Sequence, residues 1–196
     1  PLILIALLRW FPRWARLALW AMTALSFAAC LVLTDLRPTM AFYLAPTRAW
    51  ELLAGSLLAI HAPRALPAGR QWMAQALGIL GLLLILGAGL GLNATTPFPG
   101  WAAVLPVAGS VAVILGGGLG GGVATRLLST APMRGIGLIS YSLYLWHWPV
   151  IVLLRFWTID PPTPLQMTLA VGVPVILSVL SWKYVEQPFR HAGRGS

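Results

Sequence analysis

The chain alternates between long apolar blocks and short connections rich in polar residues, proline and glycine. Several blocks approach the ~20 residues that an α-helix needs to cross the hydrocarbon layer of a membrane. A shorter apolar stub covers residues 2–8. The pattern predicts an all-α, polytopic transmembrane helix bundle that forms one membrane domain over residues 1–196, without a separate soluble domain. Its six expected spans are residues 16–34, 45–62, 72–92, 101–119, 138–157 and 165–184.

The composition agrees with a lipid environment. Of the 196 residues, 59% are hydrophobic and 9% are charged, and the mean hydropathy is +0.84. Soluble domains contain roughly 45–50% apolar and about 25% charged residues. The chain therefore carries more apolar surface than a soluble core would bury. The single cysteine, Cys30, lies inside an apolar block, so no disulfide is expected within the chain.

The net charge of +9 raises the alternative of nucleic-acid binding. No basic stripe with interleaved aromatic residues occurs, however, and the cations stand between apolar blocks, so we expect membrane lipids as partners and no nucleic acid. Connections rich in Lys and Arg face the cytoplasm, and this predicts a cytoplasmic C-terminus. Of the 13 cations, most lie on alternate connections (Arg9, Arg13, Arg16, Arg64, Arg70, Arg126, Arg134, Lys183, Arg190, Arg194), and the others are Arg37, Arg48 and Arg155.

Glycines fall into two groups. The runs Gly116–Gly118 and Gly120–Gly122 lack the preceding strand and the following Lys-Ser/Thr pair of a nucleotide-binding loop, and they favour a flexible turn at the membrane edge. Glycines inside apolar blocks are typical of closely packed membrane helices. This packing interpretation covers Gly78, Gly81, Gly87, Gly89 and Gly91.

A charged residue at the centre of a membrane helix costs roughly 2.5–3.5 kcal/mol, so each such residue is a functional candidate. Arg48 and Glu51 are three residues apart in block 45–62 and share a helix face. Two interpretations remain open. The residues form an ion pair that only locks the helix end, or the carboxylate beside the guanidinium orients a sugar hydroxyl or a carbonyl oxygen.

A second candidate group lies in block 138–157. With helical spacing, Ser140, Tyr144 and His147 stack along one side. Pro149 cannot donate to the carbonyl four residues back, so a kink and a free polar group are expected beside His147. The imidazole is either a structural group satisfied by these hydroxyls or a catalytic base.

A third group follows at the predicted cytoplasmic edge, where Pro188 is expected to end the last helix. Glu186 lies there between Lys183 and Arg190. This cluster is either a solvated group of ion pairs or a place where cations hold the phosphates of a cytoplasmic donor. Asp35 and Asp160 are interpreted as loop residues, and the absence of any metal-ligand spacing predicts no metal site.

Three segments in this order resemble the acyltransferase 3 family, and in particular its O-antigen-acetylase-like branch. They are Thr47–Ile60 (TRAWELLAGSLLAI), Gly137–Leu153 (GLISYSLYLWHWPVIVL) and Ser181–Arg190 (SWKYVEQPFR). The resemblance covers the chain as the C-terminal half of such an enzyme. Between the three segments it rests on hydropathy.

The resemblance implies a multi-pass enzyme of the bacterial inner membrane. It moves an acyl group, usually acetyl, from cytoplasmic acetyl-CoA or another acyl-CoA to a hydroxyl of a cell-surface carbohydrate. In this interpretation His147 and Glu51 are the catalytic candidates. The substrate-binding candidates are Arg48, Tyr144, Ser140, Glu186 and Arg190.

The chain departs from the family at its first transmembrane helix, where members carry an Arg followed about eleven residues later by a His that is taken as the catalytic base. Arg16 is followed at that distance by Phe27, and no His precedes Thr47. We therefore expect a missing N-terminal half as a partner, and impaired or absent activity for this chain alone. The alternatives are a non-catalytic truncated remnant and a polytopic transporter or lipid-flipping protein.

Overall fold

The computed structural model describes residues 12–63, 70–93, 95–157 and 163–192, and these ranges contain helices but no strand. The predicted all-α class is therefore confirmed. The chain divides into two compact units, residues 1–127 and 128–196, which are described separately. The elements are α2 (Pro12–Leu36), α3 (Pro38–Tyr43), α4 (Ala45–His61), α5 (Gln71–Gly91), η1 (Trp101–Ala103), α6 (Val104–Gly118), α7 (Val123–Leu128), α8 (Ala131–Trp157), α9 (Pro164–Ser181), η2 (Trp182–Glu186) and α10 (Gln187–Ala192).

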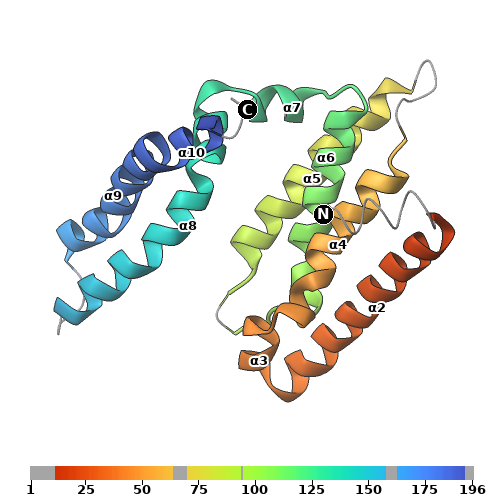
Figure 1. Cartoon of the computed structure of the whole chain (residues 1–196), viewed down its shortest axis with the longest axis horizontal. Helices are drawn as coiled ribbons and strands as arrows, with labels where there is room; N and C mark the ends of the chain where they lie inside the picture. The colour runs from red at the N-terminus through yellow and green to blue at the C-terminus, as the bar shows by residue number, and fades with distance from the viewer. Residues whose placement is uncertain (1–11, 64–69, 94, 158–162, 193–196) are drawn as a thin grey trace. The chain divides into compact units, whose positions relative to one another are not determined.

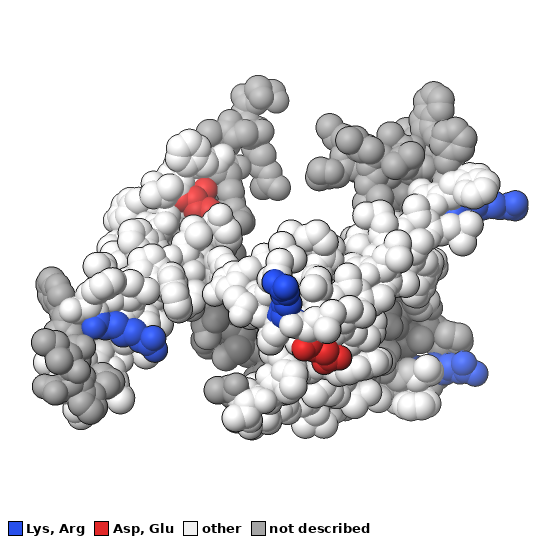
Figure 2. All heavy atoms as spheres, turned by 90° about the horizontal axis from the view of Figure 1, so that it is seen from below, with Lys and Arg blue, Asp and Glu red and all other residues white. Residues whose placement is uncertain are grey.

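Five of the predicted spans have counterparts that are long and apolar enough to cross a membrane, within the described residues: Arg13–Leu36, Gln71–Gly91, Trp101–Gly118, Ala131–Phe156 and Pro164–Phe189. The sixth predicted span is α4, which has 17 residues and lies at the lower limit of the roughly 17–25 residues of a crossing helix. The predicted stub at residues 2–8 lies outside the described residues. Charged side chains are sparse and scattered on the surface shown in Figure 2. Length and composition therefore make this chain a membrane protein.

In the first unit, α5 and α6 run side by side with their backbones in contact (Figure 1). A Cβ atom added to Gly81 would lie 2.5 Å from the carbonyl oxygen of Gly109, and one added to Gly116 would lie 2.7 Å from that of Ala74. Only glycine permits such an approach, so the packing role predicted for Gly81 is confirmed. For Gly87, Gly89 and Gly91 it stays a prediction, because an added Cβ would meet no described atom within 4 Å.

Helix α2 packs against α4 in the same unit and meets the turn that follows α5. The ring of Phe27 lies edge-on to Trp50 and Trp101, with centroid distances of 4.8 and 5.3 Å. At the end of α2, the Thr34 hydroxyl accepts a hydrogen bond from the Gly100 backbone N–H at 3.1 Å. Gly100 has a φ of +36° and lies against Thr34, which explains why glycine occupies this position.

In the second unit, α8 packs against α9. Helix α8 begins at Ala131, whereas the apolar block predicted a start at residue 138. The earlier start follows from Pro132, because proline is tolerated in the first turn of a helix, where its missing N–H has no intrahelical partner. Pro149 lies within α8, which continues through it to Trp157.

The expected helix end at Pro188 is wrong. Helix α9 continues into the wider π turn η2, in which the Gln187 N–H donates to the carbonyl of Trp182, and then into α10, which contains Pro188. Pro188 follows directly on this change of hydrogen-bond register, and it occupies the second position of α10, where proline is tolerated.

The contact between α5 and α6 generates a prediction with a matched control. Gly81→Ala should lower the free energy of unfolding by about 1–3 kcal/mol, since the new methyl group would press on backbone atoms that cannot move aside. Gly87→Ala makes the same change in the same helix with open space around it, and it should be neutral or stabilising by up to about 1 kcal/mol. Unfolding in mixed detergent micelles, followed by circular dichroism, measures both. Equal shifts for the two variants would contradict the close contact.

Candidate functional site

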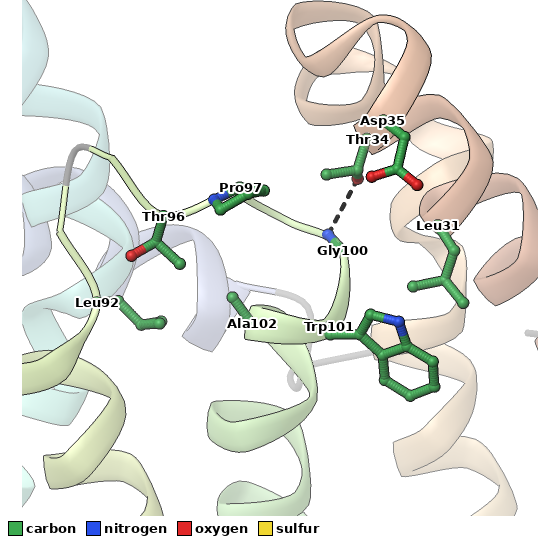
Figure 3. A pocket seen from close by; sticks show the side chains of 9 residues that line it. All are labelled: Leu31, Thr34, Asp35, Leu92, Thr96, Pro97, Gly100, Trp101 and Ala102. Carbon is green, nitrogen blue, oxygen red and sulfur yellow. Dashed lines mark hydrogen bonds between the residues drawn. The ribbon is translucent and has the colours of Figure 1, made fainter.

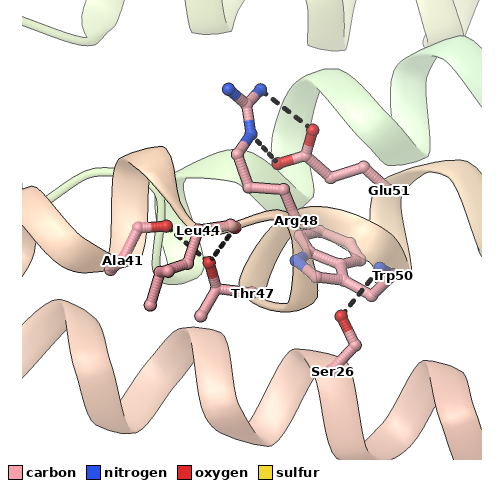
Figure 4. Close-up of polar contacts among 7 residues, drawn as sticks. All are labelled: Ser26, Ala41, Leu44, Thr47, Arg48, Trp50 and Glu51. Atoms are coloured by element: carbon pink, nitrogen blue, oxygen red, sulfur yellow. Dashed lines mark hydrogen bonds and ion pairs between the residues drawn. The ribbon is translucent and has the colours of Figure 1, made fainter.

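Arg48 and Glu51 form a two-pronged ion pair on α4 (Figure 4). The guanidinium donates from Nε to Oε1 at 3.2 Å and from Nη2 to Oε2 at 3.1 Å. The side chains are 41% and 20% exposed, and the Phe42 ring centroid lies 5.4 Å from the Arg48 Cζ atom. The pairing expected from the spacing is therefore present. Such forked contacts are the stronger class of charge-assisted hydrogen bond.

The start of α4 sets the direction in which this pair points. The buried Thr47 hydroxyl lies 2.7 Å from the carbonyl oxygen of Ala41 and 2.6 Å from that of Leu44, and its proton is shared between them. This contact ties the first turn of α4 to α3. Thr47 and Trp50 are buried, while Arg48 and Glu51 on the neighbouring face stay partly exposed.

A hydroxyl from α2 bridges the same turn. Ser26 Oγ accepts from the Trp50 backbone N–H at 2.9 Å and donates to the Pro46 carbonyl at 2.5 Å. Pro46 and Trp50 are four residues apart, so these are the two groups that an α-helical ladder pairs with each other. Ser26 therefore holds the turn that carries Arg48. Ser26 leaves no local signal in the sequence, because its partners lie 20 and 24 positions away in the chain.

The ion pair lines a cavity of about 330 Å³ within the first unit. The facing wall comes from α6 and is largely apolar, with Val107, Val111 and Ile114, and it carries one hydroxyl, that of Ser110. This volume lies at the lower end of the range for small-molecule sites. A cavity of this kind accommodates a small apolar group and directs an attached polar atom towards the ion pair.

In the second unit, His147 lies on α8 with its Nδ1 atom 3.1 Å from the carbonyl oxygen of Leu143. A carbonyl only accepts, so Nδ1 carries the proton, and in the neutral ring Nε2 is then the unprotonated nitrogen. The Tyr144 ring lies beside the imidazole, with 5.7 Å between centroids. Ser140 donates instead to the carbonyl of Gly137 on its own helix, at 2.8 Å. Of the three residues predicted to stack along one side of this helix, Tyr144 and His147 are in contact, and Ser140 bonds to its own helix.

Glu186 meets α8 from η2. The hydroxyl of Ser142, which is 2% exposed, donates to its Oε2 atom at 3.4 Å. Ser142 was missed because it lies off the predicted face of α8. A serine inside an apolar block was the available signal, since buried hydroxyls in membrane helices commonly bond across to a neighbour. Glu186 belongs to a π turn, a feature often found at functional sites. The Arg190 side chain lies outside the described residues.

The comparison with known families matches residues 1–183 to an acyltransferase domain, that of the acyltransferase 3 family. The chain belongs to this family. Within it, the segment that carries Arg48 and Glu51 is in the first unit, and those that carry His147 and Glu186 are in the second. Among the described residues, no group of three or more His, Cys, Asp or Glu is placed to hold a metal.

The relatives of this acyltransferase 3 chain carry the names of a transacylase and of O-acetyltransferases. It is 28% identical over 188 residues, 95% of its length, to a protein of Komagataeibacter xylinus provisionally named a membrane-bound transacylase, and covers 46% of that protein. It is 30% identical over 80% of its length to a provisionally named peptidoglycan O-acetyltransferase of Bacillus subtilis, and covers 26% of it. It is 36% identical over 35% of its length to the peptidoglycan O-acetyltransferase of Listeria monocytogenes, and covers 11% of it.

The chain thus spans less than half the length of these relatives. No solved structure matches it.

The bridge made by Ser26 generates a prediction about the site. Ser26→Ala should lower the free energy of unfolding by about 1–3 kcal/mol, because it removes the two hydrogen bonds that join α2 to the first turn of α4, each worth about 0.5–1.5 kcal/mol. Ser56→Ala on α4 is the control, since Ser56 donates only to the Leu52 carbonyl of its own helix at 3.3 Å and should change stability little. Thermal unfolding in detergent compares the two variants. A Ser56 variant as unstable as the Ser26 variant would contradict the bridging role.

Proposed function

We propose that this chain contributes to a membrane O-acyltransferase that moves an acyl group, in the simplest case acetyl, from a cytoplasmic acyl-CoA to a hydroxyl of a cell-surface carbohydrate. Family membership and the O-acetyltransferase names of two relatives support the reaction class. The observation that carries the proposal is the forked Arg48–Glu51 pair on the wall of a largely apolar cavity. Because the chain spans less than half of its relatives, we propose that further helices complete the enzyme.

In the first unit, Arg48 and Glu51 are proposed to bind and orient substrate. Glu51 accepts a hydrogen bond from a substrate hydroxyl. Arg48 uses two N–H groups on Glu51, and its remaining N–H groups are donors for a carbonyl oxygen of the substrate. The mostly apolar cavity lowers the local dielectric, which strengthens both interactions.

His147 is the proposed general base. With Nδ1–H held by the Leu143 carbonyl, Nε2 takes the proton of the attacking hydroxyl, a new carbon–oxygen ester bond forms, the thioester bond breaks, and the proton passes to the departing thiolate. Tyr144 and Ser140 are proposed to bind substrate on the same helix.

In the second unit, Glu186 and Arg190 are proposed to bind the cytoplasmic acyl-CoA. The guanidinium of Arg190 is proposed to donate two hydrogen bonds to the phosphates of the acyl-CoA. The hydrogen bond from Ser142 holds Glu186 against α8. This arrangement follows from a cytoplasmic C-terminus in a bacterial inner membrane, the orientation that the cation distribution favours.

Loss of acyl transfer tests the proposed roles. In the protein that contains this chain, His147→Ala should reduce O-acylation of the surface glycan by about 10²–10⁴-fold, and Glu51→Gln should reduce it strongly, with normal membrane insertion of both. Mass spectrometry of the glycan measures the modification. Arg37→Gln, an exposed change outside the proposed site, is the control and should retain activity. Wild-type acylation in the His147 and Glu51 variants would remove both residues from the mechanism.

The proposed orientation is tested separately with single cysteines. Cys30 is fully buried, so the native chain should give little background labelling. Thr95→Cys and Gln71→Cys place thiols at opposite ends of α5. In spheroplasts, a membrane-impermeant maleimide should label position 95 directly and position 71 only after permeabilisation. The reverse pattern would contradict the orientation without bearing on the chemistry.

A further inference from the structure

Three cavities of the first unit differ in the charges on their walls. The Arg48–Glu51 cavity carries both signs. A second, of about 430 Å³, lies where α2 meets the turn before η1, and the charged residue on its wall is Asp35 (Figure 3). A third, of about 520 Å³, lies where α5 begins and α6 ends, and its charged residue is Arg126. The second and third cavities sit at opposite ends of α5, so about 30 Å of helix separates them.

The third cavity is firmly built. Leu119 and Ala124 are buried, and a Cβ on Gly122 would lie 3.0–3.2 Å from side-chain and backbone atoms of Gln75. The turn itself depends on Gly120 and Gly121, which have φ values of +115° and +69°. The turn between α6 and α7 therefore packs closely against the first turns of α5.

The polar side chains on its wall can all donate hydrogen bonds, and those of Gln71, Gln75 and Arg126 are exposed. Gln71 and Gln75 are four residues apart on α5 and both line the cavity. Thr125 contributes a hydroxyl and Arg126 a guanidinium, and no acidic side chain occurs among the described lining residues. Amide, hydroxyl and guanidinium donors around one positive charge suit an anion with several acceptor oxygens. A phosphate ester is such an anion.

We propose that this cavity binds a phosphate ester and that the headgroup of an anionic phospholipid supplies it. The cavity lies at one end of the long apolar helix α5, and Trp72 on its wall is 67% exposed. Tryptophan is enriched at the headgroup level of membranes, and basic pockets beside membrane helices bind anionic headgroups. The site differs from a nucleotide-binding loop because side chains of α5 and α7 supply its donors. It is independent of the proposed acyl transfer.

Ligand-dependent stabilisation tests this site. The melting temperature of the protein in neutral detergent is measured against added dihexanoyl phosphatidylglycerol, and it should rise with concentration as the folded state binds. Dihexanoyl phosphatidylcholine should stabilise less at equal concentration. Arg126→Gln should weaken the apparent affinity for phosphatidylglycerol by about tenfold, whereas Arg126→Lys, which keeps the charge, should weaken it less. Arg37→Gln, outside the cavity, is the matched control and should respond like the wild type.

A parallel titration with ADP, a soluble phosphate ester, distinguishes a lipid headgroup from a soluble phosphate ester as the ligand. Stabilisation by ADP that depends on Arg126, without a response to phosphatidylglycerol, would overturn the lipid assignment. Equal phosphatidylglycerol responses in the wild type and in Arg126→Gln would overturn the site itself. If Arg126→Gln does not fold, Gln71→Leu removes one exposed amide donor and should weaken binding in the same direction.

Discussion

The backbone contact between α5 and α6 is the interaction on which the first unit depends. Lipid chains are as apolar as leucine, so membrane helices gain little from hiding apolar side chains and associate through close packing instead. Gly81, Gly109 and Gly116 bring the two backbones to distances that no other residue allows. The contact between α5 and α6 fixes the ends of both helices. It thereby also positions the turns that line the cavities carrying Asp35 and Arg126.

Buried hydroxyls then join the remaining helices of this unit to that pair and to each other. Thr34 ties α2 to the turn at Gly100, Ser26 ties α2 to the first turns of α4, and Thr47 ties α4 to α3. Each hydroxyl pairs backbone groups within the protein, and an unpaired polar group in hydrocarbon would cost several kcal/mol. The position of the Arg48–Glu51 pair is therefore a consequence of hydroxyl contacts made on the neighbouring face of α4.

How much of this was predictable depends on the range of each interaction. The helical class and five of the six expected spans follow from block lengths set by membrane thickness, and the Arg48–Glu51 pair follows from spacing within one helix. The contacts of Ser26, and of Ser142 with Glu186, join different helices and leave no local pattern. The same limit explains why equivalent glycines of α5 could not be sorted into packed and unpacked positions. The helix end predicted at Pro188 failed for another reason. A π turn changes the hydrogen-bond register directly before Pro188, and the sequence does not show this change.

The Arg48–Glu51 pair adds little to stability by itself, because its side chains are 41% and 20% exposed and exposed ion pairs are worth about 0–1 kcal/mol. The pair also does not hold two helices together, since both residues lie on α4 and their hydrogen bonds run to each other. What the pair does provide is a neutral unit that tolerates a low dielectric yet keeps unused donors and acceptors beside a cavity. In the proposed function, a polar group of the substrate would use those donors and acceptors.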